Sequence, residues 1–428
     1  MKKFLLLILF LSAPEAQAQG PMLNCTASVA VTPMLRADSL ADLVGDYLIT
    51  CTGGIITVPG GAVPQYNLTV FINTNLTSQQ LMAAGAPGDW SEALLIVDEA
   101  PPANQRYYTT AAGCTMLGTG IAGGANYLNT DAHPYNTNPA NVFQGRSSAA
   151  NQVEFIGIPF DPPGAGHTRT MRITNIRANA NMLGYSLTVP NNVLMMVNAG
   201  GLMINNAMQT VGFSLGGLVT SCDGSTKSSG VSFRENFASS FKTGGTIASN
   251  TVGVSSGTEN GFYTPLASIV SAGNNSGGLT TNIGNAGLAF AGTRLMVTFN
   301  EVSNAPVYVP SFVPLINVAN GNISGYAVLV GGTLTVPSPA PTTAAQSQLT
   351  QVTIAASTGN AVYEIMQTDL TKMEDLSIPF FDSLGNSLTF TGTAAINLAT
   401  SGGSGSPSLT AAVPRFNAAP TKTWTMGP

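Results

Sequence analysis

The stretch of residues 25–51, CTASVAVTPMLRADSLADLVGDYLITC, predicts a pair of β-strands held by a covalent bridge. Its two apolar-rich runs, residues 26–32 and 43–50, contain the Val, Ile, Thr and Tyr residues that are enriched in strands. In an antiparallel pair whose register places Cys25 opposite Cys51, the two sulfur atoms come within bridging distance. We therefore expect a disulfide between Cys25 and Cys51.

The two remaining cysteines, Cys114 and Cys222, form a second predicted bridge by elimination. Disulfides are favoured over free thiols because an exported protein meets an oxidising environment. Four cysteines allow three pairings, and four unpaired buried thiols are a further alternative. The sequence favours the first bridge and leaves the second open.

The N-terminal residues have the pattern of a secretory signal peptide. A basic start at Lys2 and Lys3 is followed by an apolar segment, and the small residues Ala16 and Ala18 frame a cleavage site. Residues 1–18 are therefore expected to be removed on export. No later stretch of about 18 apolar residues offers a membrane helix. We expect a secreted protein, extracellular or on the outer cell surface, without a membrane span.

Charge is scarce throughout the chain. Only 8% of its 428 residues are Asp, Glu, Lys or Arg, against about a quarter in an ordinary domain, and 47 are Gly. The nearest approach to a basic cluster is Arg169, Arg172 and Arg177, which is too little for a phosphate backbone. We expect no nucleic-acid partner. Uncharged β-surfaces associate readily, because charged edge residues are what oppose strand pairing.

Short stretches of alternating apolar residues recur along the chain, separated by Gly, Pro and Asn. This pattern predicts an all-β fold of two to three immunoglobulin-like β-sandwich domains with long loops rich in Gly, Asn and Thr. Composition places the boundaries as follows: an N-terminal β-sandwich domain at 19–215, a second β domain at 216–336 with a long loop at 244–287, a Pro-rich linker at 337–348, and a C-terminal β region and tail at 349–428.

Two catalytic patterns occur without the context that their chemistry needs. Gly212-Phe-Ser214-Leu-Gly216 matches a nucleophile elbow, but both histidines of the chain, His133 and His167, precede the serine instead of following it. Gly118-Thr-Gly120-Ile-Ala-Gly123 matches a dinucleotide-binding loop, but no helical pattern follows. We predict no enzymatic activity and no cofactor, and an unrecognised hydrolase is an alternative.

Metal binding is not predicted. Two histidines far apart and four cysteines expected to be bridged provide no zinc site. Two acidic clusters contain the oxygen ligands that calcium prefers: Asp38, Asp42 and Asp46, and Glu374, Asp375 and Asp382. Without a calcium-binding repeat, we interpret both clusters as solvated acidic loops.

Aromatic residues support a different function, the binding of polysaccharide. Trp90, Tyr107 and Tyr108 lie in or near loop-like segments, where exposed rings could stack on sugars. The competing interpretation is that these rings anchor loops on the sandwich. The alternative function is therefore a monomeric adhesin or carbohydrate-binding protein.

The runs Cys25-Thr-Ala-Ser-Val-Ala-Val31 and Asp46-Tyr-Leu-Ile-Thr-Cys51-Thr-Gly-Gly54 resemble the opening of spore-coat-U-type domains, which are similar to archaic chaperone-usher pilins. In that family, the first cysteine starts one strand and the second ends the next. The remainder of the chain resembles large uncharacterised exported bacterial β-proteins, and this implies no activity.

The resemblance implies incomplete immunoglobulin-like subunits that polymerise by donating strands to one another. This chain is much longer than a one-domain pilin, and residues 19–24 are too few for an N-terminal donor strand before Cys25. We place the candidate donor in the tail, where Leu409, Ala411 and Val413 share one face of a potential strand.

These observations predict a secreted structural protein. It would be a subunit of an extracellular fibre, surface layer or matrix and would assemble through β-strand contacts. Its partners would be copies of itself or other surface proteins, and polysaccharide is a further candidate.

Overall fold

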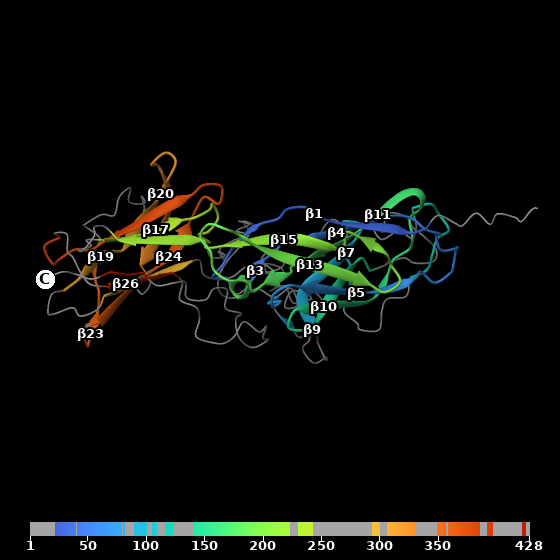
Figure 1. Cartoon of the computed structure of the whole chain (residues 1–428), viewed down its shortest axis with the longest axis horizontal. Helices are drawn as coiled ribbons and strands as arrows, with labels where there is room; N and C mark the ends of the chain where they lie inside the picture. The colour runs from blue at the N-terminus through green and yellow to red at the C-terminus, as the bar shows by residue number, and fades with distance from the viewer. Residues whose placement is uncertain are drawn as a thin grey trace, which may run out of the picture.

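The computed structural model describes residues 22–39, 41–78, 80–81, 90–100, 105–108, 116–123, 140–222, 230–242, 293–299, 306–329, 349–356, 358–385, 392–396 and 422–424. Within these residues the regular structure is almost entirely β-strand, apart from a short 3₁₀ turn, η2 (Ala180–Leu183). The predicted all-β fold is confirmed. Two curled sheets lie one beyond the other along the longest axis of the molecule (Figure 1).

The first sheet has thirteen strands and takes up the N-terminal half of the chain. We call the chain from β1 to β15 the first unit. Its sheet contains β1 (Asn24–Val29), β2 (Met34–Arg36), β4 (Tyr47–Gly53), β5 (Gln65–Ile72), β6 (Gln80–Leu81), β7 (Trp90–Val97), β8 (Tyr107–Tyr108), β9 (Val142–Ala149), β10 (Gln152–Pro159), β11 (Gly164–Thr174), β13 (Asn191–Ala199), β14 (Ile204–Asn205) and β15 (Met208–Leu215). A separate pair consists of β3 (Asp42–Leu43) and β12 (Arg177–Ala178).

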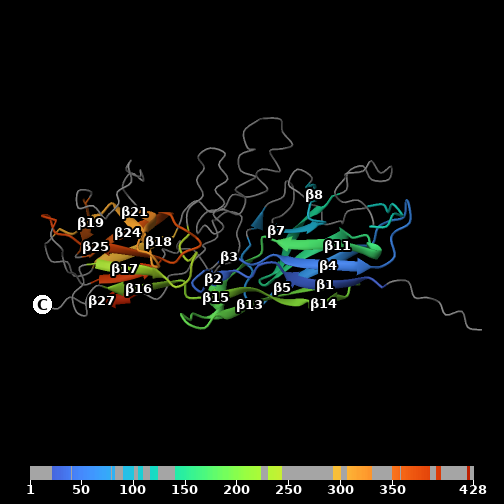
Figure 2. The same cartoon turned by 90° about the horizontal axis from the view of Figure 1, so that it is seen from above.

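The first sheet curls until its two ends approach each other. β14 pairs with β1 and β2 pairs with β15, both in parallel. Across the same boundary, the Gly45 N–H donates to the Val211 oxygen at 2.7 Å, and the Phe213 N–H donates to the Pro33 oxygen at 2.9 Å. Figure 2 shows the order β11, β4, β1 and β14 across this side. The first unit is therefore sandwich-like, with layers contributed by one continuous sheet.

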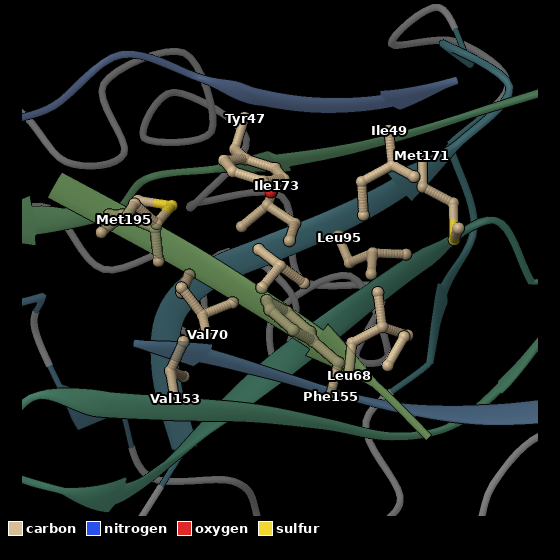
Figure 3. Packing of buried hydrophobic residues seen from close by; sticks show 14 of the residues in the cluster. Tyr47, Ile49, Leu68, Val70, Leu95, Val153, Phe155, Met171, Ile173 and Met195 are labelled. Atoms are coloured by element: carbon tan, nitrogen blue, oxygen red, sulfur yellow. The ribbon is translucent and has the colours of Figure 1, made fainter. Parts of the chain in front are cut away.

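The core of the first unit lies between these layers. In β4, the inward residues Tyr47, Ile49 and Cys51 are buried and alternate with partly exposed ones, as the two-residue period of a strand requires. Each fully buried apolar side chain stabilises the fold by about 1.5–3 kcal/mol. The residues that meet in Figure 3 come from six strands: Tyr47 and Ile49 (β4), Leu68 and Val70 (β5), Leu95 (β7), Val153 and Phe155 (β10), Met171 and Ile173 (β11), and Met195 (β13).

The predicted bridge between Cys25 and Cys51 is confirmed. β1 and β4 pair antiparallel in the register that sets Cys25 opposite Cys51, and the two Cα atoms are 4.0 Å apart. Both cysteines are fully buried in the core of the first unit. Cys222 is the last residue of β16, and Cys114 lies outside the described residues, so the second predicted bridge is not tested.

The second sheet has ten strands, and we call the chain from β16 to β27 the second unit. Its sheet contains β16 (Leu218–Cys222), β17 (Gly230–Glu235), β18 (Arg294–Phe299), β20 (Phe312–Asn317), β21 (Ile323–Leu329), β23 (Ile354–Ala355), β24 (Thr358–Gln367), β25 (Glu374–Pro379), β26 (Gly392–Ile396) and β27 (Lys422–Trp424). β19 (Tyr308–Pro310) and β22 (Leu349–Gln351) form a separate pair. This unit has its own hydrophobic cluster, in which the Phe299 and Phe380 rings pack edge to face.

The described strands divide between the two sheets after Leu215, where β15 ends, and before Leu218, where β16 begins. The C-terminal region expected at 349–428 does not form a sheet of its own, because β24 pairs with both β18 and β21. The long loop at 244–287 and the linker at 337–348 lie outside the described residues.

Candidate functional site

The aromatic candidates for glycan binding do not form an exposed platform in the part of the chain that the structure describes. Trp90 begins β7 and is only 5% exposed, and the Arg146 guanidinium carbon lies 5.4 Å from its ring centroid. The burial of Trp90 fits the competing interpretation, in which the ring has a structural role instead of stacking on sugars. Tyr107 and Tyr108 form β8, which pairs in parallel with β9, and their side chains are outside the description.

The tail candidates for a donor strand, Leu409, Ala411 and Val413, lie outside the described residues. Farther along the tail, Lys422–Trp424 forms β27, which pairs antiparallel with β26 of the second sheet. Residues 422–424 therefore pair within the second unit.

The acidic cluster of Asp38, Asp42 and Asp46 is not the set of solvated loops that we expected. Asp38 and Asp42 are buried, and both bind Arg36. Asp46 is partly exposed and pairs with Arg172 at 2.9 Å. Among the described residues, no three His, Cys, Asp or Glu side chains are grouped so that they could hold a metal ion.

The serine of the elbow-like motif is also buried. Ser214 lies inside strand β15, with its Oγ 3.5 Å from the Ala180 oxygen. A nucleophile elbow instead presents its serine on a sharp strand-to-helix turn. Gly212-Phe-Ser214-Leu-Gly216 is therefore a strand and its end, and we do not develop a hydrolase function from it.

A buried arginine joins the two units. Arg36, the last residue of β2, is fully buried, and its guanidinium donates to both carboxylate oxygens of Asp38, at 3.1 and 2.6 Å. Its Nη1 also donates to the Ser240 oxygen at 3.1 Å and to Thr293 Oγ1 at 3.3 Å, and both of these residues belong to the second unit. We call these four residues the joint. A buried charge is tolerated only when paired and hydrogen-bonded, which is the environment that the joint provides.

A loop of the first unit adds further contacts around the joint. The Gly216 N–H donates to the Ser186 oxygen at 2.6 Å. Asn236 Nδ2, in the second unit, donates to the Leu187 and Gly216 oxygens, each at 2.9 Å. These hydrogen bonds surround the point where the chain passes from one sheet to the other, and they oppose bending there.

A buried pair of acids, Glu235 and Glu374, lies in the second unit close to the joint. Glu235 accepts the Phe241 N–H at 2.6 Å and the Glu374 N–H at 2.8 Å. Burial is the main cause that raises the pKa of Glu235 to about 8; both N–H donors and Arg36 lower it, and the Glu374 carboxylate raises it. This carboxyl group therefore titrates near neutral pH. It lies close to Ser240, whose backbone oxygen accepts a hydrogen bond from Arg36.

A pocket of about 470 Å³ lies beside the joint. Residues 30–31, 33–35 and 42–46 of the first unit line it, together with Arg172 and with Ala238, Ser239 and Lys242 of the second unit. Apolar side chains from β2 and β3 meet charged groups from both units here. Most proteins hold their ligands in pockets of this kind, with a mainly apolar lining and a few fixed polar groups.

The two sheets end differently at their edges. β14 and β2, at the ends of the first sheet, are two and three residues long. β16, at one end of the second sheet, has five residues, LVTSC, none of them charged, and its described partner is β17. Long uncharged edge strands are templates for adding another strand, whereas short edges are poor ones.

Sequence reasoning missed the joint, because its members lie far apart in the chain. Arg36 is separated from Ser240 by 204 positions and from Thr293 by 257. One local signal was present. Arg36 follows the apolar residues Met34 and Leu35, directly precedes Ala37-Asp38, and is one of few charges in the chain, so a buried ion pair could have been suspected.

No family model matches the chain, and no curated protein matches it significantly. The described part of the chain contains no helix with the length and apolar character that crossing a membrane requires. We therefore base the functional proposals on the sheet edges, the joint and the pocket.

Proposed function

We propose that the chain is a secreted structural protein, a subunit of an extracellular fibre, surface layer or matrix, which assembles with copies of itself through β-strand contacts. The observation that carries the proposal is the uncharged edge strand β16. The N–H and C=O groups on its outer side could pair with a strand of a neighbouring molecule, although the Leu218 oxygen already accepts the Tyr185 hydroxyl at 3.5 Å. The strand lacks the charged residues that commonly protect such edges. Val219 is 38% exposed on this strand and would contact the added strand.

The arrangement of the two units supports the same role. The units lie end to end, and two hydrogen bonds from the Arg36 guanidinium, to Ser240 and Thr293, connect one to the other, while its two bonds to Asp38 lie within the first unit. A building block whose parts hold a constant angle can repeat at a regular spacing. The low charge of the chain, 8% of its residues, weakens the repulsion between copies.

The tail offers less support for strand exchange than β16. β27 occupies the end of the tail and pairs with β26, so this part behaves as a closing strand. Donation by Leu409, Ala411 and Val413 stays a prediction. Trp90 is buried, so the adhesin alternative has less support than strand-mediated assembly.

A charge on the edge strand tests the proposal. We expect secreted wild-type protein to form filaments or sheets in negative-stain electron microscopy, and we expect Val219→Lys to remain monomeric in size-exclusion chromatography, because an edge lysine opposes pairing. Val318→Lys is the matched control: this valine lies in the second unit, is 37% exposed and follows β20 instead of lying on the edge. Circular dichroism checks that both variants are folded.

Two results would contradict the proposal. One is a wild-type protein that stays monomeric at high concentration without filaments or sheets. The other is a Val219→Lys variant that assembles as well as the Val318→Lys control.

A further inference from the structure

The pocket beside the joint has the size and position of a small-molecule site. Its volume of about 470 Å³ falls within the range of roughly 300–1,000 Å³ that is usual for ligand pockets. Both units contribute to its walls, and boundaries between domains are frequent places for ligands. Its charged groups indicate which class of ligand fits.

The wall from the second unit carries Lys242, which is only 7% exposed. Its backbone is fixed by Thr293, whose Oγ1 accepts the Lys242 N–H at 2.9 Å and whose N–H donates to the Lys242 oxygen at 2.7 Å. Among the described residues, the Lys242 ammonium group makes no ion pair or hydrogen bond. A positively charged group without a partner in the wall of a pocket attracts an anionic group, so this wall favours one.

The wall from the first unit carries two carboxylates, Asp42 and Asp46, and one cation, Arg172, which pairs with Asp46 and with Glu99 outside the pocket. Asp42 accepts the Arg36 N–H through Oδ2 at 3.2 Å, and Asp46 accepts Arg172 Nη1 through Oδ2 at 2.9 Å. The other oxygen of each carboxylate accepts no hydrogen bond from the described residues. This wall therefore favours a cationic group that donates hydrogen bonds to the two carboxylates.

We propose that the pocket binds a small zwitterion with apolar side chains, with its carboxylate at Lys242 and its ammonium group at Asp42 and Asp46. Met34 and Leu43 line the space between and would contact the apolar part of the ligand. A dipeptide with free ends and two apolar side chains has this chemistry. Because its two ends would contact different units, binding would brace the joint, which is a property separate from assembly through β16.

Titration calorimetry on the full chain tests the proposal with three probes. L-leucyl-L-leucine has both charged ends, its N-acetyl form lacks the ammonium group, and its C-terminal amide lacks the carboxylate. We expect saturable binding of the free dipeptide and at least about tenfold weaker binding of each capped form, because each loses a charge-assisted contact. No saturation by the free dipeptide up to about 10 mM, or equal binding of a capped form, would overturn the proposal.

A variant in the pocket gives an independent measurement. Lys242→Met should weaken binding of L-leucyl-L-leucine by at least about tenfold, since it removes the partner of the carboxylate. Lys372→Met is the control, because this lysine is exposed on the second unit, where it pairs with Asp369 at 2.7 Å. An unchanged affinity of Lys242→Met for L-leucyl-L-leucine would contradict the proposal. If that variant fails to fold, the capped probes on the wild-type chain decide the question alone.

Discussion

The two units differ in how their sheets end. The first unit ends its sheet on the short strands β14 and β2, which pair with its own chain, and it has a disulfide in its core. The second unit ends its sheet on the longer uncharged β16, and it buries the acids Glu235 and Glu374. The first unit is closed by the pairing of its own short end strands, whereas the second sheet ends on the longer uncharged strand β16, which lies next to β27.

This difference suggests that the two units have different roles. The closed unit gains stability from covalent closure and from a curled sheet whose ends meet. The second unit is held to it by Arg36 and contributes the edge on which assembly is proposed. Experiments that remove one feature at a time should therefore affect the two units unequally.

Removal of the joint should have the largest effect. Arg36→Met leaves the Asp38 carboxylate buried without its cation, and we expect a loss of about 3–5 kcal/mol in the free energy of unfolding. Urea denaturation monitored by fluorescence measures this loss. Lys372→Met is the control, because Lys372 forms an exposed pair with Asp369 at 2.7 Å and its loss should change the free energy of unfolding far less. Equal costs in the two variants would mean that the joint does not hold the units together.

Loss of the bridge should affect the first unit alone. Cys51→Ser should lower the free energy of unfolding of this unit by about 2–5 kcal/mol, as loss of native bridges in secreted domains does. The transition of the second unit should stay in place. Peptide mapping without reduction should recover Cys25 and Cys51 in one linked fragment, and Cys222→Ser should leave that fragment unchanged. Recovery of Cys25 joined to Cys114 or Cys222 would contradict the register of β1 and β4.

The second unit should lose stability as pH rises toward 8. Burial raises the pKa of Glu235 from 4.5 to about 8, so between these values the folded chain binds more protons than the unfolded chain. Stability is therefore greatest below about 4.5 for this group and declines by a few kcal/mol as pH rises through 8. Glu235→Gln, which mimics the protonated acid, should flatten the pH profile of thermal unfolding. A profile as steep as that of the wild type would assign the dependence to another group.

The smallest change in stability should come from Val219→Lys. A substitution on an exposed part of a strand usually shifts stability by no more than about 0.5 kcal/mol. The same substitution is expected to abolish assembly. This variant separates the contribution of the edge to association from its contribution to folding.

Local pattern was sufficient to predict part of the fold. Alternation in the two runs near Cys25 and Cys51 predicted their pairing, because the strand period and the opposed cysteines are both readable from neighbouring residues. The acids Asp38 and Asp42 were misinterpreted as solvated, because their burial depends on Arg36 and on the contacts that this arginine makes with the distant second unit.

Trp90 illustrates a second limit of the sequence. Its neighbours on the N-terminal side are rich in Gly, Pro and Asp, a composition typical of loops, so the sequence left open whether the ring is exposed or anchors a loop. Its burial results from β7 lying between β11 and β9, with Arg146 over the ring. Which strands become neighbours is decided by the sheet order, and the sequence of a single strand does not contain that information.

The parallel pairing of β1 with β14 and of β2 with β15 has a mechanical consequence. The chain enters the first unit through β1 and β2 and leaves it along β15, so tension applied between its entry and its exit pulls the parallel neighbours β2 and β15 in opposite directions along their length. The hydrogen bonds between them are then loaded together in shear and cannot be opened one after another. A molecule stretched within a fibre would resist extension first at this seam, between the segments where the first unit begins and ends.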